Sequence, residues 1–273
     1  MEHVAAAFAP LAPCLCGWMT CCDSRVLWYA QGDDDADIPN AVALTIDDVP
    51  RVGMKASNVR ELMSLLAQHR ARATFFVFFD RLNPPSNDHN YNLMVNTFVS
   101  EVKAGGHEVG LHFPGRWGQK MSLTELRWHT EQSLQIARQR FGLRVRHVRM
   151  PGGFSTPAQV TLLESYGLTV VNGTAYPGDA DVCGCLSAMA LGRCAARLAD
   201  ADGRIVILHD DKRLIAKLAS FLRHLEAQGR HAMTLADVLG PPRMSLKRAL
   251  RVADGGARGV GDTAVMAPLF VSL

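Results

Sequence analysis

The stretch AVALTIDD, residues 41–48, combines a short apolar run with two consecutive aspartates. Residues 41–46 have the length and the β-leaning character of a buried strand. Residues 57–70 follow, with apolar side chains at helical spacing and Ser57 in position to cap the first turn. A strand, an acidic turn and an amphipathic helix in this order predict one β–α unit.

The same order repeats along the chain. Further strands are predicted at residues 73–79, 107–112, 144–150, 168–171, 204–209 and 231–234. Helices are predicted between them, at residues 92–106, 122–142, 156–167, about 186–200, 211–229 and 235–239. About seven alternations of strand and helix are typical of parallel strands joined by crossover helices, so we predict the α/β class.

The chain outside this region has a different composition. Residues 1–40 hold four cysteines, an apolar lead-in and the acidic linker GDDDAD, whereas residues 241–273 contain a glycine-rich stretch. We therefore expect one domain over residues 41–240, a lead-in before it and a loosely ordered tail after it. The lead-in lacks the basic start of a signal peptide, which slightly favours a cytoplasmic location. Secretion and membrane association through this segment are the alternatives.

The composition excludes several classes of protein. The 273 residues carry a net charge of +3, with no long block of like charges, so neither nucleic-acid binding nor polybasic membrane binding is expected. No apolar run reaches the roughly 18 residues of a spanning helix. Seven cysteines are too few for a disulfide scaffold in a chain of this length. A globular enzyme or binding protein remains.

Ionisable residues stand where the predicted strands end. They are Asp47 and Asp48, Asp80, His112, Arg149, and His209 with Asp210. In a barrel of β–α units the C-terminal ends of the strands converge on one face, here called the mouth, whereas an open sheet would scatter them along a crevice. Two adjacent carboxylates allow one to bind a metal while the other takes a proton, and a histidine suits the complementary acid. The pattern favours a barrel with an acid–base site at its mouth.

These residues belong to longer motifs. The motifs are LTIDDVP (44–50), RARATFFV (70–77), GHEVGLH (106–112), VRMPGGF (148–154), NGTAYPGDAD (172–181) and IVILHD (205–210). In type and order they resemble the motifs of the polysaccharide deacetylases, carbohydrate esterase family 4 with the NodB homology domain. The resemblance runs from about residue 41 to residue 240. It implies a distorted (β/α)7-type TIM-like barrel.

The resemblance also implies a reaction, the hydrolytic removal of acetyl groups from N-acetylated sugars. By similarity to the family, Asp47 is the general base that activates water, and Arg149 orients it. Asp48 and His112 are ligands of a divalent metal, in this family usually zinc, and His209 protonates the leaving amine. Such a metal polarises the acetyl carbonyl and lowers the pKa of its bound water.

Further residues are assigned to the groove. The backbone N–H of Gly152 would stabilise the oxyanion, and Phe154 would replace the aromatic residue of the groove wall. Trp117 would either stack on a sugar or pack against the protein. Asp179 would either orient His209 through a hydrogen bond or cap the following helix.

The chain departs from the family pattern at one metal ligand. Arg116 stands where a second histidine is expected, and a guanidinium offers no lone pair to a metal. Two protein ligands make an incomplete zinc site, so either Asp80 or His89 reaches in, or Arg116 itself supplies positive charge near the acetyl carbonyl. His107 is expected to point to the opposite face of its strand. Val49 replaces the glycine of the first motif.

The leading hypothesis is a hydrolase that removes N-acetyl groups from a glycan containing N-acetylglucosamine, such as chitin or a chitin oligosaccharide. One alternative is a barrel with weakened catalysis that binds carbohydrate. The other is an amide hydrolase for a small substrate that is not a sugar. The expected partner is a glycan and the expected cofactor a divalent metal, zinc, while the sequence makes no prediction of oligomeric state.

Overall fold

The computed structural model describes Val26 and residues 40–82, 88–115, 121–173, 175–176, 187–198 and 205–240. All of them belong to one compact unit, Met1–Gly240, and the second unit of the chain, Pro241–Leu273, lies outside them. Nearly all of the lead-in predicted for residues 1–40 lies outside them as well. The lead-in and the tail therefore stay predictions.

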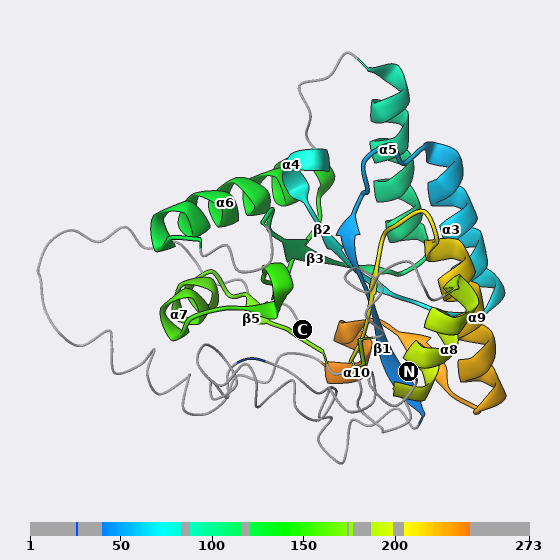
Figure 1. The fold of residues 1–273 in the computed structure, drawn as a ribbon. Coiled ribbons are helices and arrows are strands. Elements are labelled where there is room, and N and C mark those ends of the chain that lie inside the picture. Colours follow the sequence, from blue (N-terminus) through cyan, green and yellow to red (C-terminus); the bar gives the residue numbers. More distant parts are fainter. Residues whose placement is uncertain are drawn as a thin grey trace, which may run out of the picture. The chain divides into compact units, whose positions relative to one another are not determined.

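Seven strands form one central sheet (Figure 1). They are β1 (Ala41–Val49), β2 (Thr74–Val77), β3 (Glu108–His112), β4 (His147–Arg149), β5 (Thr169–Val170), β6 (Ile205–His209) and β7 (His231–Met233). Every pairing is parallel, in the order β5-β4-β3-β2-β1-β6, and β7 pairs with the start of β1. An isolated bridge between Ala175, after β5, and Val206 of β6 joins the two ends of the sheet. The predicted distorted α/β barrel is confirmed.

Helices connect the strands and cover the outside of the sheet (Figure 1). They are α3 (Ala56–Gln68), α4 (Phe79–Leu82), α5 (His89–Ala104), α6 (Leu123–Gln135), α7 (Pro157–Ser165), α8 (Ala188–Leu198), α9 (Leu214–Ala227) and α10 (Leu235–Leu239). A π-helical turn, η1 (Ile136–Arg140), extends α6, and a short 3-10 helix, η2 (Pro151–Gly153), follows β4. The predicted capping box of Ser122 and Glu125 at the start of α6 is confirmed.

Several predicted boundaries are wrong. The strand predicted at 144–150 covers only His147–Arg149, and residue 79, predicted to end a strand, begins α4. The cap predicted at Ser57 is displaced, because Lys55 is the N-cap of α3. His89, predicted in a loop, begins α5. Apolar runs that are buried on every side do not reveal where hydrogen-bonded pairing stops, which explains the errors at the strands.

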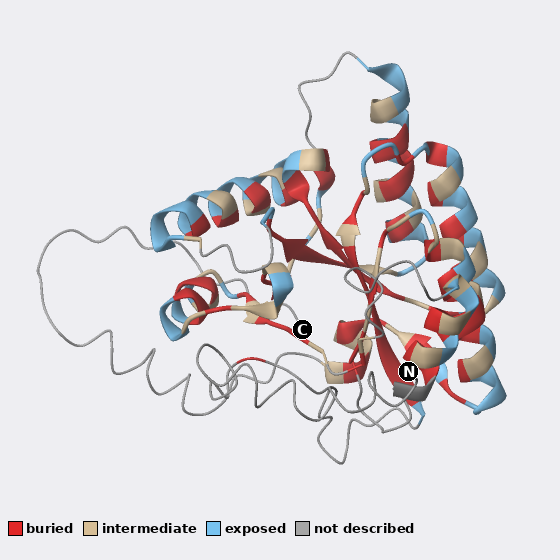
Figure 2. Cartoon of the chain, viewed as in Figure 1, coloured by how far each residue is buried: buried red, intermediate tan, exposed pale blue. Residues whose placement is uncertain are grey.

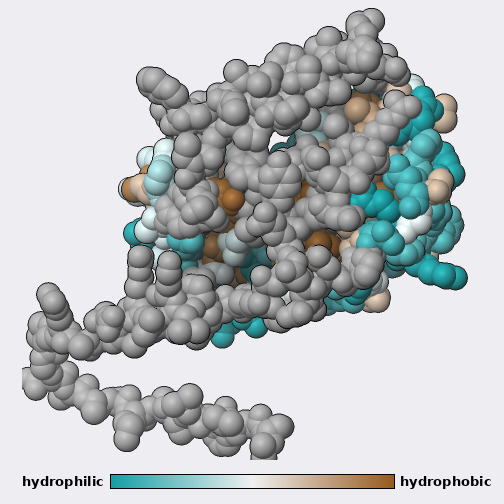
Figure 3. Space-filling view, turned by 90° about the horizontal axis from the view of Figure 1, so that it is seen from below, coloured by the Kyte–Doolittle hydropathy of each residue, from teal (hydrophilic) through white to brown (hydrophobic). Residues whose placement is uncertain are grey.

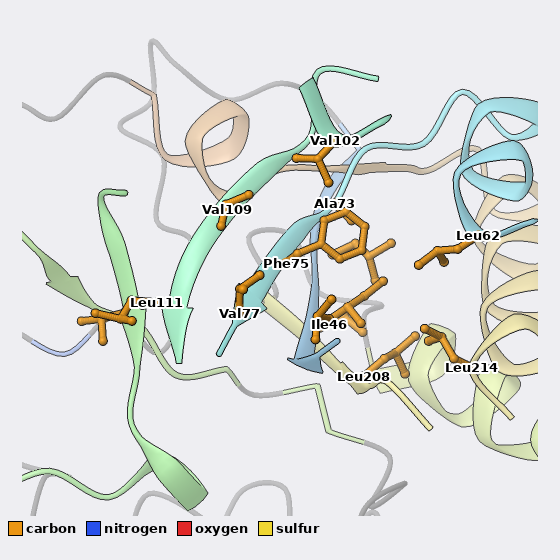
Figure 4. Packing of buried hydrophobic residues seen from close by; sticks show 14 of the residues in the cluster. Ile46, Leu62, Ala73, Phe75, Val77, Val102, Val109, Leu111, Leu208 and Leu214 are labelled. Carbon is orange, nitrogen blue, oxygen red and sulfur yellow. The ribbon is translucent and has the colours of Figure 1, made fainter. Parts of the chain in front are cut away.

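The side chains of β1 alternate between two apolar clusters. Val42, Leu44 and Ile46 face outward into the main core between the sheet and the helices, part of which is drawn in Figure 4. Ala41 and Ala43 belong to the second cluster, together with Phe76, Val171, Ile205, Leu235 and Val238. These residues come from β1, β2, β6, the position directly after β5, and α10, so the second cluster fills the interior of the barrel and α10 closes its base.

Burial follows the same layers. Figure 2 shows the strands as mostly buried and the outer faces of the helices as exposed. The right-hand edge of the described part is mainly hydrophilic in Figure 3. In the described part of the chain, no helix combines the length and the apolar character needed to cross a membrane.

Candidate active site

The first strand ends in an irregularity that turns both aspartates toward the mouth. Ile46 pairs with Phe75 and Val49 with Val77, so the register between β1 and β2 shifts at Asp47 and Asp48. Asp48 has a φ of 64°, a left-handed conformation that Asp tolerates better than most residues. In a regular strand the two carboxylates would face opposite sides. The bulge lets each one reach a different partner at the mouth.

Asp47 is held by the guanidinium of Arg149 from β4. Nη1 of Arg149 lies 2.6 Å from Oδ1 of Asp47 and 2.7 Å from Oγ1 of Thr45. Nε and Nη2 donate to the main-chain carbonyls of Val171 and Asn172, at 3.1 Å each. The guanidinium stacks on the ring of Phe76 at 4.2 Å. Arg149 is 2% exposed and Asp47 is 3% exposed.

This arrangement places a fixed ion pair across the barrel. Burial lowers the pKa of Arg149, and the neighbouring Asp47 carboxylate acts in the opposite direction. Because Arg149 comes from β4 and its guanidinium binds β1 and the chain after β5, one side chain both orients Asp47 and ties together three segments of the wall. The predicted pairing of Arg149 with Asp47 is found.

His112, at the end of β3, faces Asp48. Its Nδ1 lies 2.6 Å from the main-chain carbonyl oxygen of Arg149, and a carbonyl only accepts, so Nδ1 carries the hydrogen. Its Nε2 lies 3.4 Å from Oδ1 of Asp48. Burial by itself would raise the pKa of Asp48, but the hydrogen bond and charge of His112, with the charges of His209 and Arg81, lower it below its ordinary value.

The Asp48–His112 pair fits one side of a metal site. Because Nδ1 donates to the carbonyl, Nε2 is the ring nitrogen that faces Asp48, and in the neutral form of the imidazole its lone pair is available to a cation shared with the carboxylate. A tetrahedral zinc ion with bonds of about 2.0–2.2 Å would separate two ligand atoms by about 3.4 Å, and the observed separation is 3.4 Å. The hydrogen bond from Nδ1 to a carbonyl is the usual support of a metal-binding histidine.

A third protein ligand is absent from the described residues, which contain no group of three His, Cys, Asp or Glu side chains able to hold a metal. Asp80 and His89, the predicted substitutes, are both exposed and belong to no such group. His107 accepts a hydrogen bond from the Ala73 N–H, and burial lowers its pKa to about 4. Arg116 lies outside the described residues.

The end of β6 supplies the opposite side of the mouth. His209 pairs in register with Asp47 on the adjacent strand, and its ring meets that of Tyr176 edge-on at 5.5 Å. Nζ of the fully buried Lys217 donates to the His209 carbonyl at 3.1 Å. His209 therefore lies beside the two aspartates, as predicted, with its backbone held from α9.

Asp210 has a structural partner. Its carboxylate accepts from the backbone N–H of Arg51 at 2.8 Å and from the Arg51 guanidinium at 2.9 Å. Burial raises the pKa of Asp210, and the bonds from Arg51 act against that rise. The side chain thus fastens the loop after β1 to the end of β6, which is a structural role.

The glycine pair after β4 forms a turn that needs glycine. Gly152 and Gly153 have φ angles of 62° and 74°, and a side chain is strained in that region. The amide of Asn172 donates to the Gly153 carbonyl at 3.0 Å, which links this turn to the chain that also binds Arg149. Phe154 follows, half-buried.

The remaining predicted groove residues are not placed. Arg116, Trp117 and Asp179 lie outside the described residues. Conversely, sequence reasoning missed Thr45 and Asn172, which hold Arg149. Thr45 sits two positions before Asp47, on the same face of the strand, and that spacing was the only signal that could have found it.

Comparison with known proteins decides the family. A family model described as Polysaccharide deacetylase matches residues 34–171, just over half of the chain. The chain belongs to the polysaccharide deacetylase family. The predicted resemblance to carbohydrate esterase family 4 and its NodB-type domain is confirmed. A search of curated proteins gives no match.

Solved structures of the family share the fold. A family 4 pseudoenzyme from Bacillus anthracis has a TM-score of 0.59 at 19% identity, covering 74% of this chain and 66% of its own, so this chain spans just under two thirds of it. A family 4 acetyl xylan esterase from Clostridium thermocellum, with a cobalt ion, has a TM-score of 0.58 at 22% identity over 72% and 89%. A peptidoglycan deacetylase from Bacillus subtilis gives 0.57 at 20% identity over 80% and 98%.

Proposed function

We propose that this polysaccharide deacetylase hydrolyses the N-acetyl group of a glycan containing N-acetylglucosamine, such as chitin or its oligosaccharides. The observation that carries the proposal is the pairing at the mouth. One aspartate is locked to a buried arginine, while its neighbour stands 3.4 Å from the Nε2 nitrogen of a buried histidine. Two adjacent carboxylates with different partners suit different tasks.

Asp47 is the proposed base. Its Oδ1 is bound by Arg149 at 2.6 Å, which fixes the carboxylate and balances its charge. A water molecule between this carboxylate and a bound acetyl group would lose its proton to Asp47 as it attacks the carbonyl carbon. The new C–O bond forms as the carbonyl pair moves to oxygen.

Asp48 and His112 are the proposed holders of a divalent cation, zinc in our proposal. When bound there, the cation would supply Lewis-acid polarisation of the acetyl carbonyl. His112 is oriented for this task by its Nδ1 hydrogen bond to the Arg149 carbonyl. The backbone of the Gly152 turn is the proposed second contact for the oxyanion.

His209 is the proposed acid. It stands in register with Asp47 across β1 and β6, so an acetylated amine between them meets the base on one side and the imidazole on the other. Transfer of a proton from His209 to the amine nitrogen allows the C–N bond to break and releases acetate. The products are acetate and the free amino sugar.

One observation favours a second function, carbohydrate binding with weak catalysis. The described residues supply two metal ligands rather than three, and the solved structures that share the fold include a pseudoenzyme. A mutant of that protein is described as having restored enzymatic activity. A barrel of this kind can therefore keep its fold while its activity differs.

The test is acetate release from N-acetylglucosamine oligosaccharides, peptidoglycan and acetylated xylan, with Zn²⁺ or Co²⁺ added. We expect the wild type to release acetate from the oligosaccharides and Asp47→Asn to be slower by about 10²–10⁴-fold. Asp88→Asn is the matched control, because Asn caps helix α5 as Asp does. Absence of acetate from the wild type with every metal, while it still binds the oligosaccharide, would establish the carbohydrate-binding function instead.

A further inference from the structure

A second arginine stands at the mouth, contributed by the short helix after β2. The guanidinium of Arg81 in α4 lies 4.0 Å above the ring of Phe78. Its Nη1 donates to the main-chain carbonyl of Pro50 at 3.1 Å. The Arg81 carbonyl in turn accepts a hydrogen bond from the hydroxyl of Tyr91. Side chain and backbone are therefore both anchored.

Both anchors of the guanidinium lead to the Asp48–His112 pair. Pro50 lies two residues after Asp48, and the ring of Phe78 lies 5.1 Å from the ring of His112, tilted by 32°. Arg81 is therefore held over the same opening as the two proposed metal ligands. A guanidinium held there adds a positive charge to the opening that Asp48 and His112 face.

The charges at the mouth then balance in pairs. Asp47 is neutralised by Arg149 at 2.6 Å, and Asp210 by Arg51 at 2.9 Å. Asp48 is 43% exposed, and the Arg81 guanidinium binds the carbonyl of Pro50, two residues further along the chain. A divalent cation that approaches this pair meets a site close to neutral instead of one with a net negative charge.

We propose that Arg81 offsets the charge of Asp48 and thereby sets a low affinity of the Asp48–His112 pair for a divalent cation. The inference rests on the proposed function, because it takes this pair as the cation site. Repulsion between a fixed positive charge and a doubly charged ion several ångströms away, in a partly hydrated opening, corresponds to about a tenfold change in affinity. Because the described residues provide only two protein ligands, a tenfold change in affinity decides whether the cation occupies the site.

The experiment measures binding of Co²⁺ alone by isothermal titration calorimetry and by competition with a chelator. Arg81→Gln and Arg81→Met both remove the charge, and Met keeps an apolar stem over Phe78. Arg81→Lys keeps the charge but loses the guanidinium geometry. Arg223→Gln removes the same charge from an exposed position on α9, and Asp48→Asn removes a proposed ligand. Circular dichroism verifies the fold of each variant.

The neutral variants are expected to bind Co²⁺ about tenfold more tightly than wild type, whereas Arg81→Lys and Arg223→Gln match wild type. The gain should shrink between about 0.05 M and about 0.5 M salt, because ions screen exposed charges. Equal affinity of wild type and the neutral variants would overturn the role of Arg81, as would a gain that Arg81→Lys shares. Co²⁺ binding that Asp48→Asn leaves unchanged would instead overturn the proposed cation site itself.

Discussion

The two ends of the barrel both hold buried polar side chains, and they use them differently. At the base, Oε1 of Glu108 lies 2.5 Å from Nδ1 of His147, and Oε2 accepts from Thr74 at 2.8 Å and from the Ala236 N–H at 2.9 Å. Thr74 itself accepts from the Leu235 N–H at 2.9 Å. The base cluster thus binds the first turn of α10.

At the mouth, one pair of polar groups is buried and fully hydrogen-bonded, and we call it closed. The other pair is loosely bonded and partly exposed, and we call it open. Arg149 and Asp47 satisfy each other as completely as the base cluster does. Asp48 and His112 instead share one longer contact of 3.4 Å between a carboxylate oxygen and a ring nitrogen, and the Asp48 side chain is 43% exposed. The difference teaches that burial alone does not mark a site, because the base is equally polar. Polar groups that are only loosely paired beside an opening do.

The largest effect is expected from Arg149→Met, which would break the closed pair at the mouth. It leaves Asp47 buried without its partner, so we expect a loss of about 3–5 kcal/mol in the free energy of unfolding. Acetate release should fall by more than about 10²-fold, because the carboxylate of Asp47, the proposed general base, loses its orientation. Urea unfolding and the acetate assay measure both, with Arg144→Met, an exposed arginine, as control. An Arg149→Met protein as stable and as active as wild type would show that the Arg149–Asp47 pair neither stabilises the barrel nor orients Asp47.

Glu108→Gln tests the polar cluster at the base of the barrel. It should lower the stability of the protein and leave its activity nearly unchanged. The amide cannot accept from Thr74, Ala236 and His147 as the carboxylate does, so we expect a loss of about 2–4 kcal/mol. The pKa of Glu108 is lowered, since the bonds from His147, Ala236 and Thr74 outweigh its burial. Its contribution is therefore present at neutral pH and lost in acid, as the carboxylate becomes protonated.

The measurement for Glu108→Gln is urea unfolding at neutral pH, with the exposed Glu61→Gln as control. The kcat/KM for acetate release by the folded protein should stay within about twofold of wild type, since the base lies at the other end of the barrel. A fall in kcat/KM as large as that of a mouth variant would show that the two ends act as one unit.

Gly110→Ala would disturb the layer between the two ends. An added Cβ would lie 2.6 Å from the ring of Phe76 and 3.2 Å from the His147 carbonyl. The ring must then shift, and Arg149 stacks on it. We expect a loss of about 1–3 kcal/mol in stability together with a several-fold lower kcat. An unchanged thermal unfolding temperature would contradict this prediction, because the added Cβ would then fit beside Phe76 without cost.

The smallest effect is expected at His107, which belongs neither to the polar cluster at the base of the barrel nor to the polar groups at the mouth. Its pKa falls from 6.5 to about 4, chiefly through burial and secondarily through the charge of Arg72. The folded protein therefore binds this proton less readily than the unfolded chain, and stability decreases as the pH falls from 6.5 toward 4. In His107→Gln this decrease should be smaller by on the order of 1 kcal/mol, allowing for partial exposure. Urea unfolding at several pH values measures it, and identical pH profiles would contradict it.

The sequence predicts the β–α order and the gathering of strand-end residues, because apolar periodicity and the geometry of parallel strands are local and general rules. It cannot predict the register shift at Asp47–Asp48, which depends on how β2 ends beside β1. Nor does it reveal Glu108. A carboxylate at the start of a strand resembles any surface charge until the docking of α10 buries it.

Arg81 was missed for a related reason. It follows an aromatic run that was predicted as strand through residue 79, whereas the strand stops at Val77 and a helical turn begins at Phe79. That turn directs the arginine back over Pro50. Predicting it would require the exact end of β2, and strand ends are set by tertiary pairing rather than by composition.

The pairing of β1 with β7 and β6 has a consequence for synthesis. Ala41 of the first strand pairs with His231 near the end of the domain, and Ala43 pairs with both Met233 and Ile205. A ribosome that has made the first half of the domain has therefore released a very hydrophobic strand whose neighbours on β6 and β7 do not yet exist. Such contacts between distant parts of the chain fold slowly, and unpaired strand edges attract other chains. We expect nascent chains that stop before residue 205 to require chaperones, and the barrel to become protease-resistant only once β7 has emerged.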